Sequence, residues 1–306
     1  MTRRSFSLLT VAAWLCAGIL AVAAPVKVVG TTTMVTDLVQ EIGGNRVSVS
    51  GLMGPGVDPH LYKPTAGDIN RLQSSQLIIY TGLHLEGRMG ELFERMEKAG
   101  KKVVAVTSAI PEKSLLKPAE FEGAFDPHVW GDARLWSLCV GPVVDALTAA
   151  DPAGKADFAA RGAAYQAKLA ELHEWALERV KEVPEAGRVL ITSHDAFNYL
   201  GRAYGYQVIG VQGISTVTEA GLADVSKVVE FIKQKGVKAI FVESSVPRAT
   251  IERISADSGA KIGGELFSDA MGAPGAKVTV NGETYDEGTL IGMLKHNINT
   301  TVEALK

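Results

Sequence analysis

The amino-acid sequence predicts an α/β protein with two similar lobes, each a mainly parallel sheet flanked by helices, joined by one long helix. Three observations lead to this prediction. Segments typical of strands and of helices alternate along both halves of the chain, as they do in parallel sheets covered by helices. An extended helical pattern over residues 151–184 separates the halves. The chain of 306 residues is long enough to bury two cores.

The first 23 residues have the three-part pattern of a secretory signal peptide. Two arginines near the start precede an apolar run over residues 5–22, and Ala21-Val22-Ala23 has the small-x-small form of a cleavage site. The apolar run is nearly long enough for a membrane anchor, but the small residues at its end favour cleavage. We therefore expect residues 1–23 to be removed near Ala23 and the mature chain to be exported from the cytoplasm.

The cysteines and the net charge of the chain argue against a lipid anchor, a disulfide and a nucleic-acid partner. Cys16 follows the bulky Leu15, whereas a lipid-attachment site usually has a small residue there, so a lipid anchor is not expected. Removal of the signal peptide leaves Cys139, which cannot form an internal disulfide and is expected to pack in the core. The mature chain has 29 basic and 34 acidic residues, a net charge of −5, and no basic patch. Nucleic acid is therefore excluded as a partner.

Residues 24–150 form the first predicted lobe. Its strands are short apolar or β-branched runs, and its helices repeat apolar residues at helical spacing. The expected strands are residues 26–30, 46–52, 77–80 and 102–106, and the expected helices are residues 31–42, 66–72 and 89–98. This alternation predicts a parallel sheet with helices on both faces.

Residues 185–306 repeat this alternation and form the second predicted lobe. The expected strands are residues 188–192, 206–211 and 239–242, followed by an extended stretch at 261–267. The expected helices are residues 196–204, 218–235, 247–258 and 290–305. The second lobe is therefore expected to resemble the first.

Residues 151–184 are predicted to form the long helix that links the lobes. Asp151 is a favourable N-cap, Pro152 suits the first helical position, and Pro184 ends the pattern. A helix of about 30 residues spans about 45 Å, which is enough to join two lobes and hold them nearly rigid. Gly162 is the weak point of this prediction, because glycine lowers the stability of a helix interior.

Four side chains in loop-like settings form a candidate metal site: His60, His128, His194 and Asp269. The first two lie in the first lobe and the others in the second lobe. Ligands of open α/β sheets bind beyond the carboxyl ends of strands, so the four side chains can meet in a cleft between the lobes. Three imidazoles and one carboxylate suit a borderline divalent metal ion.

Each candidate also has a simpler interpretation. An isolated histidine in a loop is usually a solvated polar residue, and Asp269 could cap the turn before Gly272. The repeated Asp-Pro-His motif at residues 58–60 and 126–128 weakens this interpretation, because proline restricts the loop that holds each imidazole. The other histidines fit the site less well: His84 is expected at the surface or outside the ligands, His173 on a solvated helix face, and His296 in a structural role.

Four segments of the chain resemble the TroA-like metal-binding proteins, the substrate-binding proteins of zinc and manganese ABC importers. The segments are Gly54-Pro55-Gly56-Val57-Asp58-Pro59-His60, Phe125-Asp126-Pro127-His128-Val129-Trp130, Ser193-His194-Asp195-Ala196-Phe197-Asn198-Tyr199-Leu200 and Gly263-Gly264-Glu265-Leu266-Phe267-Ser268-Asp269-Ala270-Met271-Gly272. The similarity runs through essentially the whole mature chain in the same order. The long helix also resembles the rigid backbone helix of that family.

This resemblance implies a set of roles for individual residues and for the protein. His60, His128, His194 and Asp269 are implied as the metal ligands, and Glu243 as an outer partner that orients a ligand imidazole. Delivery of the metal to a membrane permease, driven by a cytoplasmic ATPase, is implied as well.

The sequence departs from both specialist patterns of this family. Zinc-dedicated members often have a histidine-rich acidic loop before the second ligand, but residues 111–125 contain no histidine. Many manganese-dedicated members have a glutamate where this chain has His194. Three nitrogens and one oxygen favour zinc, whereas a bidentate Asp269 would admit manganese or ferrous iron. We expect Zn²⁺ or Mn²⁺ as the transported ion, with iron as a further candidate.

The leading hypothesis is therefore a periplasmic metal-binding protein of an ABC importer and not an enzyme. One alternative is an exported zinc-dependent hydrolase, although a catalytic zinc usually keeps one coordination position for water. Another is a binding protein of the same fold for a siderophore-like organic ligand, which predicts a cleft lined by aromatic or arginine side chains. We expect a monomer. In the metal-free protein we expect neutral imidazoles and an ionised Asp269, so that metal binding weakens as the pH falls.

Overall fold

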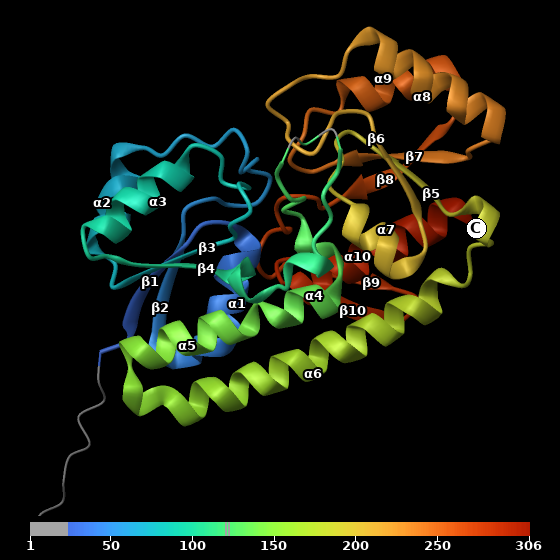
Figure 1. Ribbon diagram of the computed structural model, residues 1–306. Coiled ribbons are helices and arrows are strands. Elements are labelled where there is room, and N and C mark those ends of the chain that lie inside the picture. Colours follow the sequence, from blue (N-terminus) through green and yellow to red (C-terminus); the bar gives the residue numbers. More distant parts are fainter. Residues whose placement is uncertain (1–23, 120, 122) are drawn as a thin grey trace, which may run out of the picture.

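The computed structural model describes residues 24–119, 121 and 123–306, and it confirms the predicted fold of two α/β lobes joined by one long helix (Figure 1). The predicted signal peptide, with Cys16 and the cleavage site, lies outside the described residues. Within the described ranges, no helix is both long and apolar enough to span a membrane.

The N-terminal lobe contains a four-stranded parallel sheet in the order β2-β1-β3-β4. Its elements are β1 (Val26–Gly30), α1 (Thr33–Gly43), β2 (Val47–Gly51), α2 (Ala66–Ser74), β3 (Leu77–Tyr80), α3 (Met89–Lys98) and β4 (Lys102–Ala105), followed by α4 (Ala133–Leu138) and α5 (Val140–Ala150). Alternate strand residues face opposite sides of a sheet. Val28 and Ile79 pack with α1 and α5, whereas Val29 and Ile78 pack with α2 and α3.

The C-terminal lobe contains two parallel strand pairs, β5–β6 and β7–β8, with β5 beside β7. Its elements are β5 (Val189–Thr192), α7 (Asn198–Tyr204), β6 (Gln207–Gly210), α8 (Leu222–Lys235), β7 (Ala239–Glu243), α9 (Ala249–Ser258), β8 (Lys261–Leu266), β9 (Lys277–Val280), β10 (Glu283–Asp286) and α10 (Leu290–Leu305).

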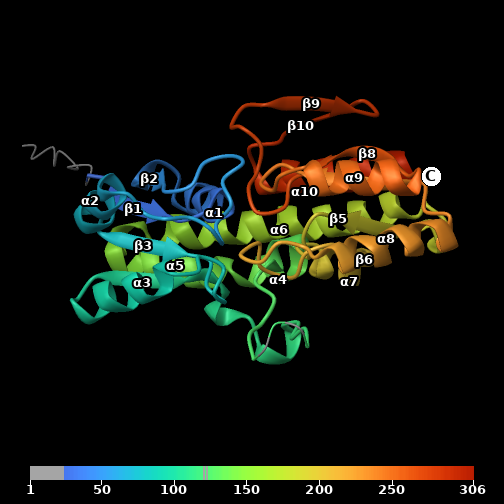
Figure 2. The same ribbon diagram turned by 90° about the horizontal axis from the view of Figure 1, so that it is seen from above.

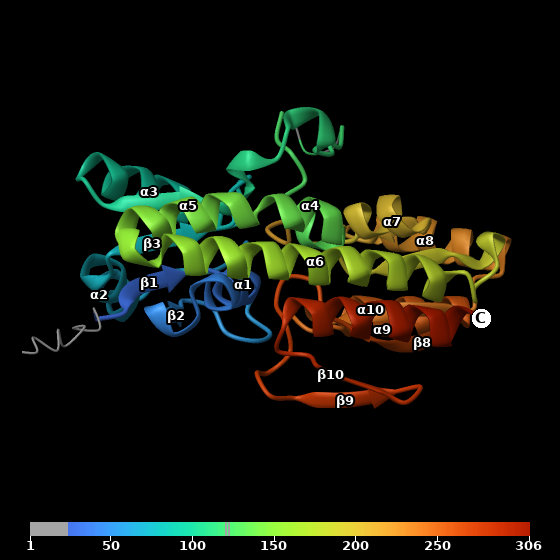
Figure 3. The same cartoon turned by 90° about the horizontal axis from the view of Figure 1, so that it is seen from below.

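The antiparallel hairpin β9–β10 is absent from the sequence-based expectation. It protrudes to one side of the C-terminal lobe (Figures 2 and 3). Asn281 and Gly282 connect its strands, and both have positive φ angles, of 52° and 82°. An Asn-Gly pair between alternating segments is a strong signal for a two-residue hairpin turn, so the sequence did contain the information.

Helix α6 (Lys155–Val180) runs along both lobes (Figures 1 and 3). Its 26 residues correspond to about 39 Å of helix. Phe158 and Leu169 belong to the core that includes α1 and α5, whereas Ala176 and Val180 belong to the core of the C-terminal lobe. One rigid element therefore contributes side chains to two cores, which fixes the position of each lobe relative to the helix.

His173 of α6 does not lie on a solvated face, so that expectation is wrong. Its side chain is buried and its ring packs against Tyr204 of α7, with the ring centroids 5.4 Å apart. The neighbouring glutamates suggested solvent exposure, but α7 of the C-terminal lobe covers this side of the helix. His173 is therefore part of the contact between α6 and the C-terminal lobe.

Gly162 does not interrupt α6, because it lies where α5 crosses the helix closely. A Cβ atom at this position would lie 2.8 Å from Cγ2 of Val144 and 3.1 Å from Cγ1 of Val140. The small residue allows the close approach of the two helices, and their packing offsets the low helix propensity of glycine.

We expect Gly162→Leu to lower the free energy of unfolding by about 1–3 kcal/mol through overpacking against α5, although leucine has the higher helix propensity. Urea denaturation of the metal-free protein measures this change. Ala164→Leu, on the exposed face of the same helix, is the matched control and should leave stability unchanged. Equal stability of the two variants would show that α5 and α6 do not pack closely at Gly162.

Candidate metal centre

His60 lies in the loop that follows β2. The loop begins with Gly54-Pro55-Gly56, and Gly56 has a φ of 71°, which favours glycine. The backbone N–H of His60 donates to Oδ1 of Asp58 over 2.8 Å. The Asp-Pro-His motif thus forms a local turn in which the aspartate holds the backbone of the histidine.

His128 is held by the aspartate of the second Asp-Pro-His motif. Oδ1 of Asp126 accepts from the backbone N–H of His128 over 2.9 Å and from the ring Nδ1 over 2.8 Å. Asn198 of α7 donates to the other oxygen of Asp126 over 3.1 Å. This contact with Nδ1 directs Nε2 of His128 toward the other candidate ligands, where a metal ion would bind.

His194 is held in the same way by Glu243. His194 follows β5 and Glu243 ends the neighbouring strand β7, so the two residues meet at the carboxyl edge of the C-terminal sheet. The backbone N–H of His194 donates to Oε1 of Glu243 over 2.8 Å, and the ring Nδ1 lies 2.5 Å from Oε2. Glu243 therefore has the contact with a candidate ligand that the family resemblance implied.

Asp269 lies in the loop after β8, and both lobes hold this loop. Trp130 of the N-terminal lobe donates from its indole Nε1 to the carbonyl of Ser268 over 2.8 Å. Asn297 of α10 accepts from the N–H of Phe267 and donates to its carbonyl. Asp269 itself is buried, so these neighbours fix where its carboxylate points.

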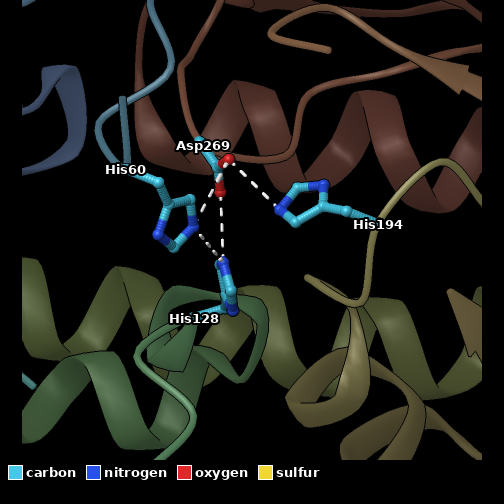
Figure 4. A group of neighbouring side chains, drawn as sticks. All are labelled: His60, His128, His194 and Asp269. Atoms are coloured by element: carbon cyan, nitrogen blue, oxygen red, sulfur yellow. Dashed lines mark hydrogen bonds and ion pairs between the residues drawn. The ribbon is translucent and has the colours of Figure 1, made fainter. Parts of the chain in front are cut away.

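The four candidate side chains converge on one point between the lobes (Figure 4). Their ligand atoms all lie within 4.8 Å of one another. Nε2 of His60 lies 3.3 Å from Nε2 of His128, and the two oxygens of Asp269 lie 3.3 Å from Nε2 of His128 and 3.2 Å from Nε2 of His194. Two ligand atoms bound at 2.0–2.1 Å to one tetrahedral zinc ion are separated by about 3.3 Å. The spacing therefore fits a small metal ion.

The buried polar atoms of the cluster lack other partners. Nε2 of His194 and both oxygens of Asp269 are inaccessible to solvent and make no hydrogen bond to any described residue outside the cluster. Buried polar atoms with so few partners are rare in proteins and call for an explanation such as an ion. A cation at the centre would satisfy all three atoms at once.

The outer carboxylates change the protonation of the imidazoles. Burial alone lowers the pKa of a histidine, but the charges of Asp126 and Asp269 outweigh it and raise the pKa of His128 to about 9. Glu243 and Asp269 likewise outweigh burial and raise the pKa of His194 well above its usual value. The expectation of three neutral imidazoles is therefore wrong, because it left out the carboxylate behind each of these two rings.

His60 and Asp269 complete the charge pattern. Burial lowers the pKa of His60 to about 3 and outweighs the attraction of Asp269, so this ring is neutral. Burial alone would raise the pKa of Asp269, but the charges of His194 and His128 hold it well below its usual range. The metal-free cluster thus contains an ionised Asp269, one neutral ring and two rings that favour the charged form.

The remaining histidines lie outside the cluster. His84 is exposed, beside a surface cavity that His60 also lines. His296 has a structural role, as expected, because its Nδ1 contacts Glu287 over 2.6 Å and its Nε2 lies 2.8 Å from the carbonyl of Glu265. The sequence did not identify Asp126 or Trp130 as residues that position the site. The repeated Asp-Pro-His motif was the available signal for Asp126, whereas no sequence signal linked Trp130 to Ser268.

The fold and this cluster define a two-lobed α/β binding protein with a candidate metal centre between its lobes. The chain belongs to the family described as zinc-uptake complex component A, periplasmic, which matches residues 28–304. The predicted resemblance is therefore confirmed, and so is the prediction that the chain is not an enzyme.

Individual relatives cover nearly the whole chain. The chain is 44% identical over 283 residues to the zinc-binding protein TroA of Treponema pallidum, covering 91% of this chain and 88% of the relative. It is 41% identical over 285 residues to the manganese-binding lipoprotein MntA of Bacillus subtilis, covering 92% and 90%. The solved structure of the periplasmic zinc binding protein TroA from Treponema pallidum matches with a TM-score of 0.86 and 43% identity, over 92% of this chain and 99% of that one.

We expect the ring of His128 in the metal-free protein to titrate near pH 9. Asp126→Asn should lower this midpoint by about 1–3 units, because the imidazolium loses a carboxylate partner. Nuclear magnetic resonance of the histidine rings measures both midpoints. Asp145→Asn, on the exposed side of α5, is the matched control and should leave the midpoint unchanged. A midpoint near the usual histidine value in both wild type and Asp126→Asn would contradict the assigned role of Asp126.

Proposed function

We propose that this chain captures a zinc or manganese ion in the periplasm and delivers it to the permease of an ABC importer. The main support is the convergence of His60, His128, His194 and Asp269 from both lobes at the spacing of a small metal ion. Family membership supports the importer, since the relatives include proteins named as metal ABC transporter substrate-binding lipoproteins. The comparisons favour this function over the exported hydrolase and over the binding protein for an organic ligand.

The donor set favours zinc but admits manganese. Three imidazole nitrogens suit zinc, and zinc ranks above manganese in general affinity. However, one oxygen of Asp269 faces His128 and the other faces His194. A carboxylate in this orientation can bind through both oxygens, and the higher coordination number suits manganese and ferrous iron. Relatives named for zinc and for manganese are similarly close to this chain, at 44% and 41% identity.

Capture works through a closed site that both lobes complete. Each lobe supplies two of the four ligands, so the bound ion ties the lobes together. Four protein ligands leave a tetrahedral ion no open position for a reacting water, which suits transport more than catalysis. The ion must also displace protons from His128 and His194, and its binding therefore weakens as the pH falls.

We propose further that the mature protein is a monomer without a lipid anchor. Several relatives are named as lipoproteins, but in this chain Leu15 precedes Cys16, and Ala21-Val22-Ala23 offers a cleavage site after that cysteine. Intact mass of the periplasmic protein should match an unmodified chain beginning near Ala24, and sedimentation should give the mass of one chain. A mass increased by lipid at Cys16, or a dimer, would contradict this.

We expect His60→Ala and His194→Ala each to weaken zinc binding by more than about 100-fold, because loss of a ligand should exceed the 10–100-fold effect of losing an outer partner. Competition with a chromophoric chelator measures the affinity, and elemental analysis of the purified periplasmic protein should find about one metal ion per chain. His84→Ala is the matched control, since His84 is a nearby exposed histidine outside the cluster.

These measurements separate the metal site from the fold. Unchanged affinity in both variants would show that the four residues do not bind the ion. A parallel titration with manganese ranks the two ions, and thermal unfolding of each metal-free variant checks that the fold is intact.

A further inference from the structure

Two of the four candidate ligands, His128 and Asp269, are held by contacts that span the lobes. Asp126, which anchors His128, is bound by Asn198 of the C-terminal lobe. The loop of Asp269 is bound by Trp130 and by Thr33, whose Oγ1 accepts from the N–H of Met271 over 2.9 Å. Together with the anchoring of His194 by Glu243 within the C-terminal lobe, these contacts hold three of the four candidate ligands in fixed positions.

His60 is held differently. No hydrogen bond to its Nδ1 is found in the described part of the chain, and no carboxylate lies behind its ring as Asp126 and Glu243 lie behind the others. Its side chain is also the most accessible of the four, although only 9% of the residue is exposed. Its loop contains Gly54, beside which a Cβ atom would meet open space, and Gly56, where a Cβ atom would lie 3.4 Å from the carbonyl oxygen of Ser244 in the C-terminal lobe. His60 is therefore the ligand that can move with the least disruption.

One side-chain hydrogen bond ties this loop to the opposite lobe. Oδ2 of Asp58 accepts from Oγ1 of Thr216 over 2.5 Å, across 158 positions of sequence. Oδ1 of the same carboxylate accepts from the backbone N–H of His60. Within residues 52–65, all of which are described, Asp58 is the residue that makes a hydrogen bond to the C-terminal lobe. A displacement of Thr216 would therefore move Asp58 and, through it, the backbone of His60.

A surface cavity lies beside this hydrogen bond and beside His60. This cavity of about 500 Å³ is lined by residues of the N-terminal lobe, among them His60 and Leu61, and by Val217 of the C-terminal lobe. Val217 directly follows Thr216, and Leu61 directly follows His60. The other candidate ligands are at most 1% exposed, so His60 is the member of the cluster that is nearest to solvent.

We propose that Asp58 and Thr216 form a latch that holds His60 over the metal ion and sets how long the ion stays bound. They are positioning residues, because neither is a ligand. The inference rests on the proposed metal-binding function and adds a specific control of release to it. The hydroxyl group of Thr216 is the critical group: when it leaves the carboxylate of Asp58, the loop of His60 loses its tie to the C-terminal lobe and the cavity becomes an exit.

Release of zinc from the mature protein to an excess of chelator, followed by stopped flow, tests the latch. Thr216→Val keeps the shape of the side chain but removes the hydroxyl group, and it should accelerate release about ten-fold, as expected for a lost hydrogen bond to a charged group. Association should change little, because such changes act mainly on dissociation. Thr216→Ser should restore slow release, and Thr218→Val, an exposed position on the same loop, should release zinc at the wild-type rate.

A double-mutant cycle shows whether the latch acts through His60. In a His60→Ala background, Thr216→Val should have no further effect on release, because the ligand that the latch holds is gone. Equal release rates of wild type and Thr216→Val would overturn the latch, as would an undiminished effect of Thr216→Val in the His60→Ala background. If wild type bound neither zinc nor manganese, the metal-binding function itself would fail and the latch with it. Thermal unfolding of the metal-free variants should match that of wild type.

Discussion

The burial of three carboxylates in one small volume is the constraint on which the rest of this structure depends. Asp126, Glu243 and Asp269 are each at most 3% exposed, and an unpaired buried carboxylate is strongly unfavourable. The imidazoles between them supply the compensation, either as imidazolium ions or as ligands of a dication. Asp126 and Glu243 are each paired with an imidazole of their own lobe, whereas Asp269 of the C-terminal lobe also faces His128 of the N-terminal lobe, so full compensation of Asp269 requires the lobes to be correctly placed.

The fold meets this constraint by holding His128, His194 and Asp269 rigidly. Helix α6 contributes to the cores of both lobes, so neither lobe can shift far without disturbing a core. The carboxyl ends of β5 and β7 place His194 beside Glu243, and the loop after β8 is held from both sides. Rigidity of this kind keeps the charged groups in place, but it would also keep a bound ion away from solvent. Under the proposed function the site must give up its ion, which requires one element that is less firmly held, and we proposed the loop of His60 as that element.

The sequence predicted the fold and identified the four candidate ligands, because short-range sequence patterns indicate both. Strand–helix alternation, the signal-peptide pattern and the Asp-Pro-His motifs can each be recognised within a few residues. What the sequence did not predict depends on contacts between distant segments. The burial of His173 requires α7 to cover α6, the tie from Asp58 to Thr216 joins two lobes, and the protonation of His128 depends on how Asp126 and Asp269 flank its ring. The hairpin β9–β10 is different, since its Asn281-Gly282 turn was a local signal.

Charge equivalence explains how one buried cluster can accommodate both the presence and the absence of an ion. Two imidazolium protons and one divalent cation carry the same charge, so the three carboxylates are compensated equally in either state. His128 and His194, each between two carboxylates, favour the protons, whereas the ring of His60 is neutral. Under the proposed function, the neutral ring of His60, which is the most accessible of the four residues, can bind an arriving ion without first losing a proton. The proposed release step involves the loop of the same residue, so the two proposals together assign both entry and release of the ion to His60.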